Sequence, residues 1–100
     1  LQRIARRIRT GYHPEKIILF GSMARGTAGK NSDIDLLIIK RTSKPFHKRW
    51  AEVCRIVSDL RRDIGFSPFV ITPIELEERT ARNDPFIKEI LEEGKVLYAA

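Results

Sequence analysis

The sequence predicts one domain of the α/β (α+β) class, with a small mixed β-sheet of three to four strands packed against helices. Short apolar runs typical of strands alternate along the chain with segments of helical periodicity. The chain has 100 residues, the size of one small domain, and 42% of them are hydrophobic, enough for a single core. We therefore expect residues 1–100 to form one domain.

The first third of the chain predicts a helix, a strand and a short second helix. Apolar residues of Leu1–Thr10 share one helical face with arginines on the other side, and Gly11 is the expected end of this helix. Lys16–Phe20 is a run of β-formers that ends at Gly21, which predicts a buried strand. Ser22–Gly26 then follows as the start of a short helix, before a loop that contains Gly29, Asn31 and Ser32.

The middle of the chain predicts a central strand followed by a long helix. Ile34–Ile39 is almost wholly apolar, as expected of a strand covered on both faces. Pro45 opens a helix that ends before Gly65, and its apolar residues form one stripe at spacings of four, three, four and three: Phe46, Trp50, Val53, Val57 and Leu60. We therefore expect Phe46 and Trp50 to be core residues.

The last third predicts a third strand and two helices. Phe69–Ile71 is the strand candidate, weakened at its N-terminal end by Pro68. Thr72-Pro-Ile-Glu75 is a capping box with proline at the first helical position, and Asp84-Pro85 opens another helix. Val96–Tyr98 is either a fourth strand or a tail.

Composition favours a cytoplasmic protein with an anionic partner. Nineteen Lys and Arg against 13 Asp and Glu give a net charge of +6, compatible with nucleotide phosphates, nucleic acid or an acidic protein surface. No apolar run reaches the roughly 20 residues that span a bilayer. Leu1–Thr10 alternates Ile with Arg, unlike a secretory signal, and the single Cys54 is expected to be a reduced thiol.

Three features within fifteen residues predict a phosphate and metal site. Gly21-Ser22 lies between a strand and a helix, where backbone N–H groups attract phosphate. Asp33 and Asp35 flank Ile34, so both carboxylates should share one face and suit Mg²⁺. Two cations could meet a triphosphate: Arg25 and Lys30. Each feature alone fits an ordinary turn, a solvated strand end or a surface charge, so the prediction depends on their combination.

The combination resembles the nucleotidyltransferase superfamily that includes DNA polymerase β. The stretches Phe20-Gly-Ser-Met-Ala-Arg-Gly26 and Ser32-Asp-Ile-Asp-Leu-Leu-Ile38 are similar to those of the minimal nucleotidyltransferases of bacteria and archaea. Ile71–Leu76 and Ile90–Tyr98 resemble later segments of the same proteins. The resemblance implies that Gly21 and Ser22 hold the β- and γ-phosphates of ATP or another nucleoside triphosphate. It also implies that Asp33 and Asp35 bind Mg²⁺, while AMP passes to a hydroxyl acceptor and pyrophosphate leaves.

One position departs from that family. A third carboxylate normally lies on the third strand, where it completes the metal site and helps to deprotonate the acceptor. The corresponding residues here are Ser67, Pro68 and Phe69, and the nearest carboxylates, Asp63 and Glu75, are better explained as a helix end and a capping residue. Losing a general base costs about 10²–10⁴ in rate.

Three hypotheses remain open from the sequence. The first is an adenylyl-transferring enzyme, in the family's role of antitoxin to a helical HEPN-type toxin, and the second is a pseudoenzyme that neutralises its partner by contact. The third and least favoured is nucleic-acid binding by the basic helix faces, because no aromatic stacking platform accompanies the charges. Exposed apolar residues would also allow a homo-oligomer.

Overall fold

In the computed structural model, which describes residues 1–29, 33–61 and 63–100, four strands form one mixed sheet in the order β3-β2-β1-β4. The central strands β1 (Lys16–Phe20) and β2 (Ile34–Ile39) are antiparallel, and β2 runs parallel to β3 (Phe66–Ile71). The C-terminal segment is a strand, β4 (Lys95–Ala99), paired antiparallel with β1 at the second edge. The predicted mixed sheet is confirmed.

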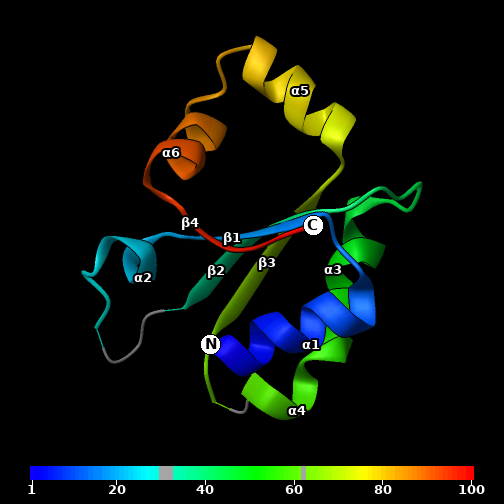
Figure 1. The fold of residues 1–100 in the computed structure, drawn as a ribbon, viewed down its shortest axis with the longest axis vertical. Coiled ribbons are helices and arrows are strands. Elements are labelled where there is room, and N and C mark those ends of the chain that lie inside the picture. Colours follow the sequence, from blue (N-terminus) through cyan, green and yellow to red (C-terminus); the bar gives the residue numbers. More distant parts are fainter. Residues whose placement is uncertain (30–32, 62) are drawn as a thin grey trace.

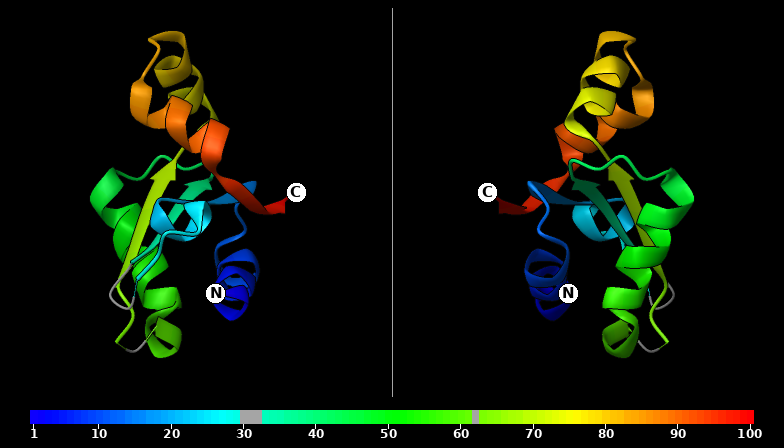
Figure 2. Two further views of the ribbon diagram at one scale, coloured as in Figure 1. Left: turned by 90° about the vertical axis from the view of Figure 1, so that its left-hand side faces the viewer. Right: turned by 90° about the vertical axis from the view of Figure 1, so that its right-hand side faces the viewer.

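Helices cover both faces of this sheet (Figure 1). One face carries α1 (Gln2–Tyr12), α3 (Phe46–Ile56) and α4 (Ser58–Arg61), and the other carries α5 (Pro73–Ala81) and α6 (Pro85–Glu93). The short α2 (Ser22–Arg25) follows β1 directly. Figure 2 shows α5 and α6 rising from the sheet on the side opposite α1 and α4.

Over the part of the chain that the structure describes, we find no helix with the length and apolar character needed to cross a bilayer.

Side-chain alternation along the strands divides the core into two clusters. Ile34, Leu36 and Ile38 point toward α1 and α3, whereas Leu37 and Ile39 point toward α6. All of these β2 side chains are buried, as expected of a central strand. The residues of β2 that share a face with Leu37 therefore also face the α5–α6 side.

The expected core positions of Phe46 and Trp50 are wrong. Their exposed fractions are 45% and 53%, whereas the neighbouring Arg49 is only 5% exposed. Helix α3 is therefore turned so that Arg49 and Val53 face the sheet. Phe46 lies at the edge of this contact, with its ring 4.5 Å from the Arg49 guanidinium carbon.

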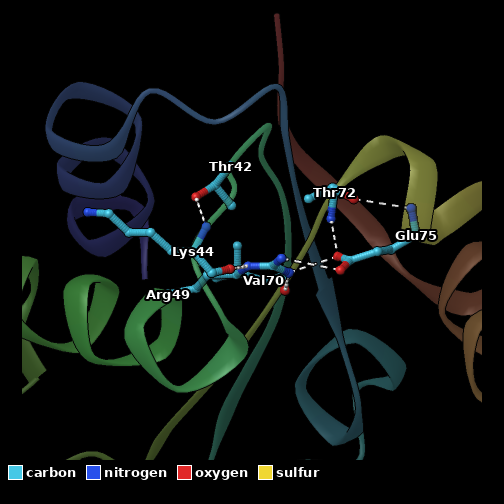
Figure 3. Close-up of polar contacts among 6 residues, drawn as sticks. All are labelled: Thr42, Lys44, Arg49, Val70, Thr72 and Glu75. Carbon is cyan, nitrogen blue, oxygen red and sulfur yellow. Dashed lines mark hydrogen bonds and ion pairs between the residues drawn. The ribbon is translucent and has the colours of Figure 1, made fainter.

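A hydrogen-bond network explains why an arginine occupies that buried position (Figure 3). The Arg49 guanidinium donates to the backbone carbonyls of Lys44 and Val70, at 2.7 and 3.2 Å. It also forms a two-pronged ion pair with Glu75, at 2.7 and 3.2 Å. Glu75 in turn accepts from the Thr72 backbone N–H and completes the predicted capping box of α5. One buried cation thus ties α3, β3 and α5 together.

Three element boundaries differ from the sequence expectation. Helix α1 continues through Gly11 to Tyr12, with Gly11 packed closely against Ile56 of α3, and His13 caps it in the left-handed conformation. The long helix after Pro45 breaks at Val57, whose ψ of 8° leaves the helical range, so α3 and α4 are separate. Strand β3 begins at Phe66 rather than Phe69, because an edge strand tolerates Pro68.

Candidate functional site

The corner between β1 and α2 is built on a glycine that no other residue could replace without strain. Gly21 has φ 75° and ψ −158°, a region that is essentially restricted to glycine. A β-carbon at this position would also collide with the carboxylate of Asp35. The Asp35 side chain therefore lies directly against the Gly21 backbone.

The two predicted acidic residues lie at the start of β2. Asp35 is half-buried, pairs with Phe20 across the ladder, and faces the α5–α6 side of the sheet. Asp33 precedes the strand and is exposed. Its carboxylate lies against Gly65, the residue just before β3, where a β-carbon would collide with it. Two glycines from different loops thus leave room for the two carboxylates.

The electrostatics of Asp35 show that the two acids interact. Partial burial raises the pKa of the Asp35 carboxyl, the nearby Asp33 charge raises it further, and Arg25 acts in the opposite direction. Phe20 is the direct cross-strand neighbour of Asp35, and such neighbours lie about 4.5–5.5 Å apart at Cβ. A bound cation stabilises two neighbouring carboxylates in a partly desolvated site, because it offsets their mutual repulsion. The pair is therefore chemically suited to a divalent ion.

Two of the remaining predicted ligand-binding residues, Ser22 and Arg25, lie on α2, which follows the Gly21 corner. Ser22 is the first residue of α2 and is partly exposed. Arg25 is held by two carboxylates of α6, at 3.5 Å from Glu89 and 3.6 Å from Glu93. Lys30 lies outside the described residues.

The third-strand residues next to Asp35 include no carboxylate. Ser67 pairs directly with Asp35, and Phe69 follows on the same face of the sheet, whereas Pro68 points to the opposite face. Glu75 is engaged with Arg49 and the α5 cap, and Asp63 is exposed in the turn before β3. Within residues 1–29, 33–61 and 63–100, no three His, Cys, Asp or Glu side chains form a metal-binding group.

Three features of the site were missed by the sequence analysis. Gly65 is brought to Asp33 by the parallel β2–β3 register, which pairs Ile34 with Phe66. The partners of Arg25 come from a helix more than sixty residues away in sequence. An aromatic cluster also extends from Phe20 along this face, with ring centroids 5.6 Å and 5.9 Å apart in the pairs Phe20–Phe86 and Phe69–Phe86. Only the alternation of β3 could have indicated which of its residues face Asp35.

Comparison with known proteins agrees with the predicted relationship. The sequence model of the "Polymerase beta, Nucleotidyltransferase" family matches residues 2–100. The chain is 38% identical over 88 residues to "Putative protein adenylyltransferase MJ1305" of Methanocaldococcus jannaschii, covering 82% of this chain and 56% of that protein. It is also 36% identical over 84 residues to "Putative protein adenylyltransferase MJ0604" of the same organism, covering 84% of this chain and 78% of that one. The chain thus spans just over half the length of the first relative.

The fold is similar to that of a solved toxin-antitoxin with AMP-PNP. The TM-score is 0.70 at 22% identity, and the match covers 99% of this chain and 73% of the other. This likeness concerns the fold, whereas the family follows from the sequence match over nearly the whole chain. The chain belongs to the polymerase beta nucleotidyltransferase family, among its minimal nucleotidyltransferases.

Proposed function

We propose that this chain binds ATP through Gly21, Ser22 and the Asp33–Asp35 pair and transfers AMP to a hydroxyl of a protein partner. The observation that carries the proposal is the contact between the Gly21 backbone and the Asp35 carboxylate, with Asp33 close enough to raise the pKa of Asp35. A phosphate-binding corner and a pair of metal-binding oxygens are thereby adjacent. The names of both M. jannaschii relatives support adenylyl transfer.

The two carboxylates fit Mg²⁺, which binds through one or two carboxylates and completes its shell with water and substrate phosphates. Asp33 and Asp35 would hold the ion, and a bound cation would offset both the partial burial and the Asp33 charge that raise the pKa of Asp35. When bound, Mg²⁺ supplies neutralisation of phosphate charge. Because Asp33 and Asp35 provide only two carboxylates, they suit a Mg²⁺ ion that binds together with the nucleotide.

The reaction follows from this placement. The acceptor hydroxyl oxygen forms a bond to the α-phosphorus, and the bond from that phosphorus to the α,β-bridging oxygen breaks, so pyrophosphate leaves. Gly21 and Ser22 hold the departing phosphates, and Arg25 lies within electrostatic reach of Asp35. The hydroxyl proton passes to water or to a group of the acceptor. Most of the catalysis is then positioning and electrostatic stabilisation.

A second candidate function is favoured by the composition of β3. Ser67 and Phe69 occupy the face where the family has its third carboxylate, so the general base is missing among these residues. A rate loss of about 10²–10⁴ would leave a protein that binds Mg²⁺–nucleotide and acts on its partner mainly by contact. The two functions share one nucleotide site and differ in whether AMP is transferred to the partner.

The proposed partner is a helical HEPN-type toxin, with this chain as its antitoxin. The fold similarity to a toxin-antitoxin with AMP-PNP supports this assignment, as does the adenylyltransferase name of the relatives. The exposed apolar side chains Phe46, Trp50 and Phe86 supply surface for a protein contact, since large apolar residues gathered on a surface mark interaction sites.

The test is label transfer to the protein encoded beside this chain. We expect Mg²⁺ and ATP labelled in the α-phosphate to label the partner with the wild-type chain and not with Asp33→Asn/Asp35→Asn. ATP labelled in the γ-phosphate should leave the partner unlabelled in both cases. A stable complex without label supports contact neutralisation, and equal labelling by the double variant refutes the assigned site.

A further inference from the structure

Helix α1 carries a charge arrangement that the fold itself does not require. It contains four arginines and no carboxylate, and its first turn has no acidic residue. Within the described residues, the ion pairs of this helix include only Arg7, bound to Asp59 at 2.8 Å. Like charges three or four residues apart repel, and cations near a helix N-terminus oppose the helix dipole. Residues that are unfavourable for local stability, such as these arginines, are expected at functional sites.

The arginines line two neighbouring hollows on this surface. One hollow of about 220 Å³ lies between α1 and α4 and is lined by Arg3, Arg6, Arg7, Thr10 and Leu60. A second of about 140 Å³ lies between α1 and β4, and its lining includes Arg6, Arg9 and Tyr98. Arg6 lines both hollows, so they form one track across α1. We call this surface the α1 track.

An aromatic ring lies at one end of the α1 track. The Arg9 guanidinium carbon is 4.9 Å from the centroid of the Tyr98 ring. Tyr98 is partly exposed on β4, and it pairs with Ile17 on the α1 face of the sheet. The sequence shows no aromatic stacking platform beside the basic helix faces, but strand pairing brings Tyr98 to arginines almost ninety residues away.

We propose that the α1 track binds a single-stranded polynucleotide. Guanidinium groups at steps of three residues, about 4.5 Å along the helix, follow a phosphate backbone. The Arg9 guanidinium, held against the Tyr98 ring, presents its outer plane for one base to stack on, an arginine contribution that single-strand binders use. The track lies on the sheet face opposite Asp35, so the proposal does not depend on the nucleotide site.

The binding test uses a fluorescent oligouridylate of about 16 nucleotides and its anisotropy. Because Arg7 is paired with Asp59 and Arg9 is used for stacking, Arg3 and Arg6 are the expected phosphate contacts, and the affinity should fall about 7-fold between 50 and 200 mM salt, from a slope of about −0.7 per contact. Arg3→Gln/Arg6→Gln should leave the affinity nearly independent of salt by the same relation. Arg82→Gln/Lys88→Gln removes two exposed cations from the α5–α6 region and should leave the dependence unchanged.

A second comparison separates base stacking from simple attraction of anions. Tyr98→Leu should weaken oligouridylate binding about tenfold, within the range for one stacked base, whereas Tyr98→Phe should retain it. The melting temperature of each variant monitors folding, since Tyr98 also packs against the core. Polyglutamate serves as a polyanion without bases and should be insensitive to Tyr98→Leu.

Several outcomes would overturn the proposal. These are no oligouridylate binding at 50 mM salt, an equal loss from the two charge-matched double variants, or polyglutamate binding as tight as that of the oligouridylate. The last result would instead assign the track to an acidic protein surface.

Discussion

Replacing Gly21 with alanine should damage both the stability of the fold and the nucleotide site. The backbone conformation at φ 75° and ψ −158° costs a non-glycine residue about 1–3 kcal/mol. The new β-carbon also meets the Asp35 carboxylate, which has to move. Alanine regains about 0.4–1 kcal/mol by restricting the unfolded chain.

We therefore expect Gly21→Ala to lower the free energy of unfolding by about 2–3 kcal/mol once the displaced carboxylate is included. In a domain of this size, each kcal/mol shifts the melting temperature by about 4–8 °C, so a loss of about 10–20 °C is expected. Gly26→Ala is the matched control, because Gly26 has the same φ of 75° with nothing within 4 Å of the added carbon. That variant should lose about 1 kcal/mol or less.

A double-mutant cycle separates backbone strain from the collision. In an Asp35→Ala background the nearest remaining atom is the residue-35 β-carbon at 3.5 Å, an ordinary contact. The cost of Gly21→Ala should therefore fall by about 0.5–3 kcal/mol in that background. Denaturant unfolding measures the stability terms, and the rise in melting temperature with Mg²⁺ and ATP measures the site. Equal losses for Gly21→Ala and Gly26→Ala, or an intact nucleotide-induced rise in Gly21→Ala, would refute the geometry.

Three further predictions concern charged groups. The pKa of Asp35 is raised in the folded state, so its ionised form destabilises the fold. Asp35→Asn should therefore melt at a higher temperature than wild type at pH 7. Thermal melts at several pH values should show this difference vanishing below about pH 4, where the wild-type carboxyl is protonated in both states. Arg49→Met leaves a buried network without its cation and should cost about 3 kcal/mol in denaturant unfolding, whereas a loss below about 1 kcal/mol would mean that the network contributes little. Glu89→Gln/Glu93→Gln releases Arg25 from two exposed ion pairs worth about 0.2–1 kcal/mol each. Calorimetric titration should then show tighter binding of Mg²⁺–ATP, and unchanged affinity would show that Arg25 does not contact the nucleotide.

The parts of the fold that local sequence determines were predicted closely. The bounds of β1 and β2 match the two continuous apolar runs, and the capping box opens α5 where Thr72 and Glu75 are spaced for it. These features depend on residues near one another in the chain. Val96–Tyr98 alone does not distinguish a strand from a tail, because so short a strand is defined only by its pairing with β1.

The features that failed depend on distant partners. Periodicity placed Phe46 and Trp50 in the core, but burial of Arg49 became favourable once Glu75 and the Val70 carbonyl were present to satisfy it. No pattern within α3 could show those partners.

The candidate site also combines features that local sequence determines with features that depend on distant parts of the chain. The Gly21-Ser22 corner and the Asp33–Asp35 pair could be named from their spacing, whereas the contact of Asp33 with Gly65 depends on the register of two parallel strands. The same register places Ser67 beside Asp35.

The central claim is that Asp33, Asp35 and the Gly21 corner form one Mg²⁺–nucleotide site. Equilibrium titration of ATP into the wild-type chain, with and without Mg²⁺, tests it most directly, beside Asp33→Asn and Asp35→Asn. We predict saturable binding that requires Mg²⁺ and is lost in both variants while each remains folded. Binding of equal strength without Mg²⁺, or in either folded variant, would contradict the account.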